Sequence, residues 1–488
     1  MNTFKHKSLY AAVAGLGALA AAGAAQAVSV NHDGLGQVLI YPYYTVRAVD
    51  IPIGTTPPTV VAAAYNSLLS VVNSTASTKV VKVRFLEGKN SREVLDFNLY
   101  LSAKDVWTAA IIPSGEGGGI FTADKSCTTP VVSSSSASPT LFVNYGYSGS
   151  NDDKAGTSLD RTKEGYVEII EMGDVVGSTA VAATHVNGVP PCTNSALQFP
   201  VAPSNTVPGT GGLFGTMTLI NVLKGEDFGV DATALAGFSS QALWFEPGDI
   251  RPTLAAVNPK RSVVVAGTNV FITDWLLSGN NADPVSAVLM HDNVYNEFVV
   301  EPTTKSGTDW VVTFPTKREY VAVGTGAASK LFQSNFGATG SCDDVVLTQF
   351  DREERTIISQ TSFSPPPPTQ TDSLCWEANV ISVNGKNVLG SKNVSNVPTT
   401  FTAGWISLNF RGATVPATRH QLIGGASQGF NTVTGGTFNT ATTTFNGLPV
   451  VGFAGITFEN ETLVVGPGAN VQSNYGGNFN HKVTSDVK

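Results

Sequence analysis

Charged side chains are scarce in this chain, and no stretch of it is strongly basic. Asp, Glu, Lys and Arg make up 14% of the 488 residues, with 29 basic and 37 acidic side chains. Because nucleic acid and anionic lipid are recognised by clustered Lys and Arg, this composition predicts neither partner. Gly (49) and Pro (26) are plentiful instead, a balance that is typical of turn-rich β-structure with a weakly charged exterior.

The motifs of metal and cofactor chemistry are also missing. No two of the six His and four Cys stand at metal-ligand spacing, and no H-E-x-x-H occurs. The Gly-rich stretches at 115–119 and 209–212 lack the Lys and the strand-to-helix context of a phosphate-binding loop. No repeat of fixed period is present, which argues against a solenoid or propeller. The sequence therefore predicts no metal, no cofactor and no assigned catalytic residue.

The first 27 residues have the organisation of a secretory signal peptide. Lys5 and Lys7 form a basic start, Leu9–Ala22 is almost wholly apolar, and Ala25-Gln26-Ala27 is a small-x-small cleavage site. We expect a mature chain from Val28 with 27 basic and 37 acidic side chains, a formal charge of −10. No later segment is long and apolar enough for a span of about 20 residues, so we expect no integral membrane segment in the mature chain.

All four cysteines lie in the expected mature chain. An even number of Cys in an exported protein favours disulfides. We predict the sequential pairs Cys127–Cys192 and Cys342–Cys375, because local closure is the simplest connectivity. The two other connectivities stay open. A four-Cys zinc site is a weaker alternative, since no pair has C-x₂₋₄-C spacing.

Alternation of apolar and polar residues is the dominant pattern along the chain. In 79–87, Val81 and Val83 alternate with Lys82 and Arg84, which predicts a strand with one wet face. The same pattern recurs in further predicted strands at 95–101, 166–172, 214–223, 287–290, 297–300, 309–314, 380–383, 406–410 and 450–458. We therefore predict an all-β chain of two or three antiparallel β-sandwich units, Ig-like or jelly-roll-like, with long loops.

Changes in composition divide the chain into four parts. Ser/Pro/Gly-rich stretches at 131–139 and 203–212 and four prolines at 365–368 are typical of linkers. The predicted parts are a signal peptide (1–27), a β-sandwich domain with the 127–192 disulfide (28–205), a second β-rich domain (206–365) and a C-terminal β-rich segment (366–488).

Two segments are harder to assign. The stretch 424–447 is rich in Gly, Thr and Asn and low in charge. We interpret it as long-loop or β-arm material, with disorder as the alternative, in a C-terminal segment that is free to pack back on the first sheet. Helical periodicity is scarce, and its best example is Asp231–Ala242.

One catalytic motif is matched formally. Gly425-Ala426-Ser427-Gln428-Gly429 has the G-x-S-x-G pattern of a nucleophile elbow, in which a strand turns into a helix and exposes the serine. The following FNTVTGG does not favour a helix, and no Asp or Glu lies between Ser427 and Glu459. We therefore interpret Ser427 as part of a flexible Gly/Ser loop.

Other polar groups are weaker candidates. His291-Asp292, with Glu297 nearby, is the best acid–base candidate among the histidines, although an ordinary loop histidine is the simpler interpretation. Asn151-Asp152-Asp153 carries oxygen ligands that suit Ca²⁺, but the spacing fails the EF-hand rule and a solvated acidic loop is the better interpretation. We interpret the mixed charge run 351–355 as an exposed, self-paired face.

Aromatic residues are the remaining candidates for binding. Sugar-binding platforms need exposed coplanar rings, whereas an isolated Trp on a strand usually packs in the core. The aromatic residues considered are spread over separate segments: Tyr41, Tyr43, Tyr44, Trp107, Trp244, Trp310, Trp376 and Trp405.

Several phrases together resemble exported proteins of Gram-negative bacteria that are called cell-surface proteins. They are GLGQVLIYPYYTVR after the signal, VKVRFLEGKNSREVLDFNLYLSAKDVWTAAI at 81–111, GYVEIIEMGDV at 165–175 and TDWVVTFPTKREY at 308–320. The resemblance implies export and a surface location, and it brings no activity or catalytic residue.

Together these patterns predict a secreted structural or adhesive protein of the cell surface or extracellular matrix, which acts by contact and without catalysis. The expected location is extracellular or at the cell surface, with the periplasm as the alternative. Expected partners are other copies of the chain, envelope or matrix components, and glycans, with no nucleic acid. A secreted hydrolase on a β-scaffold and a carbohydrate-binding protein are the alternative functions.

Overall fold

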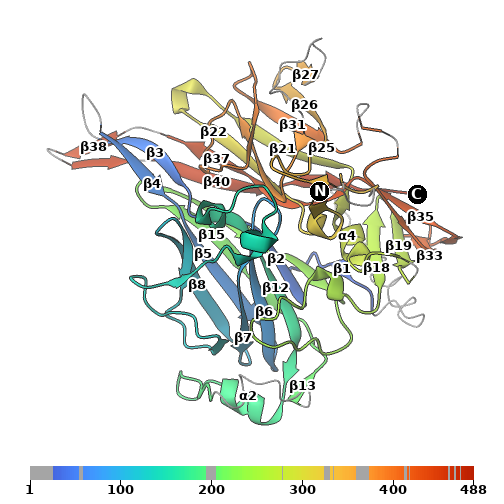
Figure 1. Ribbon diagram of the computed structural model, residues 1–488. Helices are drawn as coiled ribbons and strands as arrows, with labels where there is room; N and C mark the ends of the chain where they lie inside the picture. The colour runs from blue at the N-terminus through green and yellow to red at the C-terminus, as the bar shows by residue number, and fades with distance from the viewer. Residues whose placement is uncertain are drawn as a thin grey trace, which may run out of the picture.

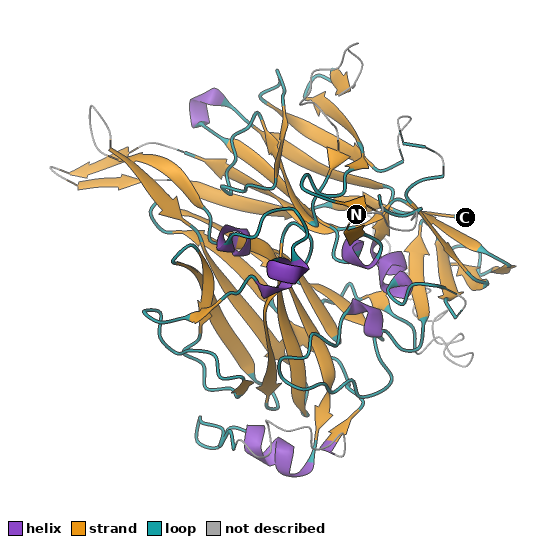
Figure 2. Ribbon diagram, viewed as in Figure 1, coloured by secondary structure: helices purple, strands orange, loops and turns teal. Residues whose placement is uncertain are grey.

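The computed structural model describes residues 26–53, 59–193, 205–276, 278–323, 330–333, 335–358, 373–411, 415–416, 418–459, 462–466, 469–472 and 474–488. The predicted signal peptide lies outside them except for Gln26 and Ala27. Strands dominate the described residues and helices are short (Figure 2). The strands pair almost entirely antiparallel, so the predicted all-β class is confirmed.

Two large sheets form a first sandwich (Figure 1). The first sheet, in spatial order, contains β1 (Ser29–Val30), β17 (Thr233–Ala236), β2 (Val38–Thr45), β12 (Glu164–Val175), β6 (Thr78–Glu87), β7 (Glu93–Leu101) and β10 (Thr128–Thr129), with β13 (Thr206–Val207) beside β12. The second sheet contains β11 (Thr140–Leu141), β9 (Gly117–Phe121), β8 (Val106–Ser114), β5 (Asn66–Asn73), β15 (Thr216–Asn221) and β16 (Glu226–Asp231), with β14 (Leu213–Phe214) beside β5. Strands from both sides of residue 205 share these sheets, because β17 pairs with β2 and β15 with β5.

Alternating apolar side chains of the two sheets meet in one core. Val83 of β6 and Ile169 of β12 lie in the same buried cluster as Trp107 of β8 and Leu219 of β15. This is the arrangement that period-two alternation produces when two sheets pack face to face.

The wet face predicted for β6 is wrong. Lys79 and Lys82 are fully buried, and Arg84 is nearly so. The segment that follows β17 covers this side of the sheet, since Lys82 Nζ donates hydrogen bonds to the carbonyls of Glu246 and Asp249. Each buried cation is paired with carboxylates of the neighbouring strands, which is the condition for burying a charge.

Two five-stranded sheets form a second sandwich in the described part of the chain. The third sheet contains β30 (Val394–Val397), β29 (Ala378–Val383), β22 (Gly307–Thr313), β37 (Val451–Phe458) and β40 (Tyr475–Asn480). The fourth sheet contains β27 (Thr356–Ile358), β26 (Val346–Asp351), β31 (Ala403–Asn409), β21 (Asn293–Val299) and β41 (Lys482–Thr484).

The third sheet is shared between the two sandwiches. Trp310 and Val312 of β22 pack in the core that contains Ile406 and Leu408 of the fourth sheet. Val311, between them, points the other way and joins the core of the first sandwich. Both faces of β22 are therefore buried, whereas the fourth sheet keeps one open side.

The fifth sheet is formed partly by the Gly/Thr/Asn-rich stretch. It contains β18 (Arg261–Ala266), β19 (Asn269–Asp274), β33 (Ser427–Asn431) and β34 (Thr437–Thr440). The stretch 424–447 is thus ordered β-structure. Asp231–Ala242, the best helix candidate in the sequence, is not helical: its residues Thr233–Ala236 form β17, which pairs with β2.

Smaller elements connect the sheets. The remaining strands are β3 (Ala48–Ile53), β4 (Thr59–Ala64), β20 (Met290–His291), β23 (Ala322–Val323), β24 (Asn335–Phe336), β25 (Asp343–Asp344), β28 (Ser373–Leu374), β32 (Gln421–Gly424), β35 (Thr443–Asn446), β36 (Leu448–Pro449), β38 (Thr462–Gly466), β39 (Ala469–Gln472) and β42 (Asp486–Val487). The α-helices in the described part of the chain are α2 (Gly177–Ala183) and α4 (Asp283–Leu289). No helix among the described residues has the length and apolar character to cross a membrane.

Two disulfides join the same cysteines as the sequential pairing. Cys127–Cys192 ties the segment before β10 to the segment after α2. Cys342–Cys375 flanks the β25–β28 pair. All four thiols are therefore used.

Candidate functional site

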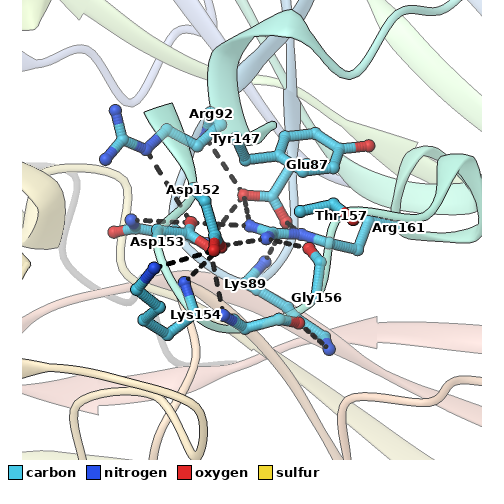
Figure 3. A network of polar contacts seen from close by, with 12 residues as sticks. Glu87, Lys89, Arg92, Tyr147, Asp152, Asp153, Lys154, Gly156, Thr157 and Arg161 are labelled. Atoms are coloured by element: carbon cyan, nitrogen blue, oxygen red, sulfur yellow. Dashed lines mark hydrogen bonds and ion pairs between the residues drawn. The ribbon is translucent and has the colours of Figure 1, made fainter. Parts of the chain in front are cut away.

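A buried ion cluster holds the acidic loop against the β6–β7 turn (Figure 3). Arg161 Nη2 lies 2.8 Å from Glu87 Oε1, and Arg161 Nη1 lies 2.7 Å from Asp153 Oδ1. The Arg161 guanidinium also lies 4.0 Å from the ring centre of Tyr147. We call Glu87, Asp153 and Arg161 the Arg161 cluster.

The acceptors of this cluster are occupied by the protein itself. Glu87 accepts the backbone N–H groups of Lys89, Asn90 and Arg92, which orders the turn after β6. Burial alone would raise the pKa of Asp153, but hydrogen bonds and charge from Arg161 lower it below its ordinary value. The cluster is therefore a structural clamp, because its cation and its two carboxylates are paired with one another.

The acidic loop is only partly the solvated loop that we predicted. Asp153 is buried against Arg161, whereas Asp152 is more exposed and pairs with Lys154 at 2.8 Å. These carboxylates already have cationic partners. Across the described ranges, no group of three or more His, Cys, Asp or Glu is placed to hold a metal ion.

A second buried carboxyl lies in different surroundings. Glu377 is 1% exposed, and neither of its oxygens has a hydrogen-bond partner within bonding distance among the described residues. Burial raises its pKa to about 8, although the positive charge of Lys317 acts in the opposite direction. Such a carboxyl is mostly protonated at neutral pH.

The formal catalytic serine is not in a flexible loop. Ser427 begins β33, is 1% exposed, and pairs across the sheet with Thr273. Its Oγ lies 2.6 Å from Thr273 Oγ1 and 2.5 Å from Thr443 Oγ1. Strand β32 precedes the serine and strand β33 begins at it, so the chain does not form the strand-to-helix elbow. The hydroxyl is held by the side chains of two threonines.

Among the described residues, the side-chain partners of that serine are threonines and not histidines. His291 is hydrogen-bonded through Nδ1 to Ser485 Oγ at 3.0 Å, and burial lowers its pKa to about 4. Glu297, its predicted neighbour, points outward from β21. His420 has Nδ1 2.6 Å from the Phe410 carbonyl and Nε2 3.5 Å from Asp343, so both ring nitrogens are engaged.

Two hollows on the surface of the described residues are also not lined by side chains suited to acid–base catalysis. One, of about 450 Å³, is lined mainly by Gly209–Gly212, Gly36–Gln37 and Ser239–Ser240. The other, of about 320 Å³, lies on the outer side of the second sheet between Leu68, Thr108 and Thr218 among others. No Asp, Glu, His, Lys or Cys lines either hollow.

The open side of the fourth sheet gathers three aromatic rings from neighbouring strands. Trp405 of β31 is 39% exposed, while Ile406 and Leu408 on the other side of the strand are buried. The Trp405 ring stacks on Phe350 of β26 with centroids 4.1 Å apart and an interplanar angle of 10°. Tyr295 of β21 lies on the opposite flank of Trp405 with centroids 6.2 Å apart.

Register explains why these rings meet. Phe350 is directly opposite Trp405, and Tyr295 is opposite Ser407, which is two residues further along β31. Directly opposite and diagonal residues on one face of antiparallel strands are within reach of aromatic side chains. We call the side of the fourth sheet that carries Phe350, Trp405 and Tyr295 the aromatic face.

From the sequence, Trp405 was expected to be an isolated ring on a strand, without neighbouring aromatic side chains. Trp107 and Trp310 are fully buried, as expected for Trp on strands, but Trp405 is not. A signal was present, because alternation in AGWISLNF places Trp405 on the same side as Ser407 and Asn409. Only the pairing of β21, β31 and β26 brings Tyr295 and Phe350 to it.

Comparison with known proteins adds no assignment: no protein-family model, curated protein or solved structure matches this chain.

Proposed function

We propose that the protein is an exported, non-catalytic cell-surface or matrix protein that attaches to its partner through the aromatic face. The observation that carries the proposal is Trp405, which is 39% exposed on the open side of a sheet and stacks on the half-buried Phe350. Aromatic side chains supply large contact area, and Trp and Tyr are enriched among residues that dominate binding energy.

Pre-ordering of the rings supports a binding role. Trp405 lies between Phe350 and Tyr295, so its side chain loses little freedom when a partner covers it. Binding that immobilises fewer side chains retains more of its contact energy.

Export is supported by the signal-like residues 1–27 and by the two disulfides. Disulfides persist in oxidising compartments and are rare in the cytosol. A non-catalytic role is supported by the engaged hydroxyl of Ser427 and by the two engaged ring nitrogens of His420.

The test is retention of the purified full chain on the envelope and matrix fraction of the host, measured by pelleting over a concentration series. We expect Trp405→Ala to weaken retention at least tenfold, because truncating a central Trp commonly costs more than about 1.4 kcal/mol of binding free energy. Phe214→Ala is the matched control, since Phe214 is an aromatic of similar exposure (41%) on the second sheet. Equal retention of wild type and Trp405→Ala would remove the proposal.

A further inference from the structure

We infer that the aromatic face binds a neutral saccharide. This inference rests on the proposed function, because it names the class of partner that the same face takes. The polar groups that surround the three rings, and the near absence of net charge among those groups, favour this class of ligand.

The rings are placed in rows with short polar side chains. In the row next to the Phe350–Trp405 pair, Thr348 lies opposite Ser407, which lies opposite Tyr295. In the following row, Asn409 lies opposite Asn293. Hydroxyl and amide groups both donate and accept hydrogen bonds, which suits a ligand whose rim consists of hydroxyl groups.

Charge on this face is balanced. Glu297 lies opposite Trp405, and Lys482 lies opposite Tyr295. One carboxylate and one ammonium give no net field that would concentrate an anionic or a cationic polymer. An uncharged polar ligand is the better match.

A saccharide unites the two requirements of the face. A pyranose ring presents apolar C–H groups on one side and hydroxyl groups around its edge. Its apolar side can pack on the solvent-facing edges of the three rings while its hydroxyl groups hydrogen-bond to neighbouring side chains. A protein partner would usually need about 800 Å² of contact surface on each side. Three rings with a polar surround match a smaller, amphipathic ligand more closely.

The decisive experiment uses the envelope and matrix fraction with its glycans intact or cleaved by periodate, which breaks carbon–carbon bonds between vicinal hydroxyl groups. We expect periodate treatment of the fraction to abolish the part of retention that depends on Trp405. Retention that depends on Trp405 and survives periodate in full would overturn the saccharide inference while leaving the contact function intact. Equal retention of the wild type and Trp405→Ala on the untreated fraction would overturn both the saccharide inference and the contact function.

Affinity electrophoresis of the full chain in gels containing soluble β-glucan, dextran, galactomannan or alginate identifies the class. We expect at least one neutral polysaccharide to retard the wild type, with at least a tenfold weaker apparent affinity for Trp405→Ala and no change for Phe214→Ala. Retardation by alginate alone, weakened by salt, would contradict the inference. Tyr295→Ser provides a second variant, and thermal unfolding of each protein identifies any variant that fails to fold.

Discussion

In the Arg161 cluster, each charged side chain is paired with another charged side chain of the protein. On the aromatic face, by contrast, the Trp405 ring is partly exposed to solvent. Arg161 is held by Glu87 and Asp153 in a buried setting. Trp405 is held on its flanks but keeps over a third of its surface exposed. The difference separates two roles: the first region stabilises the fold, and the second is available to a partner.

The largest effect is expected from breaking the cluster. Arg161→Met removes the guanidinium and leaves Glu87 and Asp153 buried without their main cation, so we expect the free energy of unfolding to fall by about 3–5 kcal/mol. Denaturant unfolding of the purified chain measures it.

Arg251→Met is the control for that prediction, because Arg251 is 62% exposed and pairs with Asp249, which is also partly exposed. Exposed ion pairs contribute about 0–1 kcal/mol. If the two substitutions cost the same, the cluster would have no special role in stability.

A smaller and pH-dependent effect is expected at Glu377. Its pKa is raised from 4.5 to about 8 in the folded protein, so the folded state keeps a proton that the unfolded chain releases. The contribution of Glu377 therefore lowers stability progressively as pH rises from about 4.5 to 8. We expect Glu377→Gln to raise the melting temperature relative to wild type more at pH 8 than at pH 5.

The comparison between variant and wild type is needed because other buried acids titrate in the same range. Burial raises the pKa of Glu168 and of Glu171 to about 7, and both remain in the variant. Glu353→Gln, at an exposed position of the 351–355 turn, is the control. A Glu377→Gln difference that is the same at both pH values would contradict the raised pKa.

The smallest effect is expected at Ser427. Ser427→Ala removes hydrogen bonds to Thr273 and Thr443, so we expect a loss of about 1–2 kcal/mol in unfolding free energy. Retention on the envelope fraction should not change. Labelling of the wild type by a fluorophosphonate probe that is lost in Ser427→Ala would instead support the hydrolase alternative.

Alternation predicted the strands well but not what covers them. Val81 and Val83 are core residues, as their period-two spacing predicts. The same spacing made Lys82 look solvent-facing, because alternation within one strand carries no information about the 246–249 segment that packs over it. Burial of cations required pairing with distant strands, which a single sequence does not specify.

The aromatic face also combines a feature that alternation predicts with one that depends on the pairing of distant strands. Alternation places Trp405 beside Ser407 on one side of its strand. Tyr295 and Phe350 are 110 and 55 positions away, and only the order of the fourth sheet brings them together. At Ser427 the local pattern matched a catalytic motif. In the structure the serine lies in strand β33 and its hydroxyl is hydrogen-bonded to Thr273, which the local pattern did not indicate.

Hydroxyl-radical footprinting of the wild-type chain, free and bound to the envelope fraction, maps the surface that the bound partner covers. Oxidation is read by mass spectrometry at Trp405 and Tyr295 on the aromatic face and at Phe214 on the second sheet. We expect binding to protect Trp405 and Tyr295 from oxidation and to leave Phe214 as reactive as in the free protein. Protection of Phe214 with Trp405 unchanged would contradict this expectation.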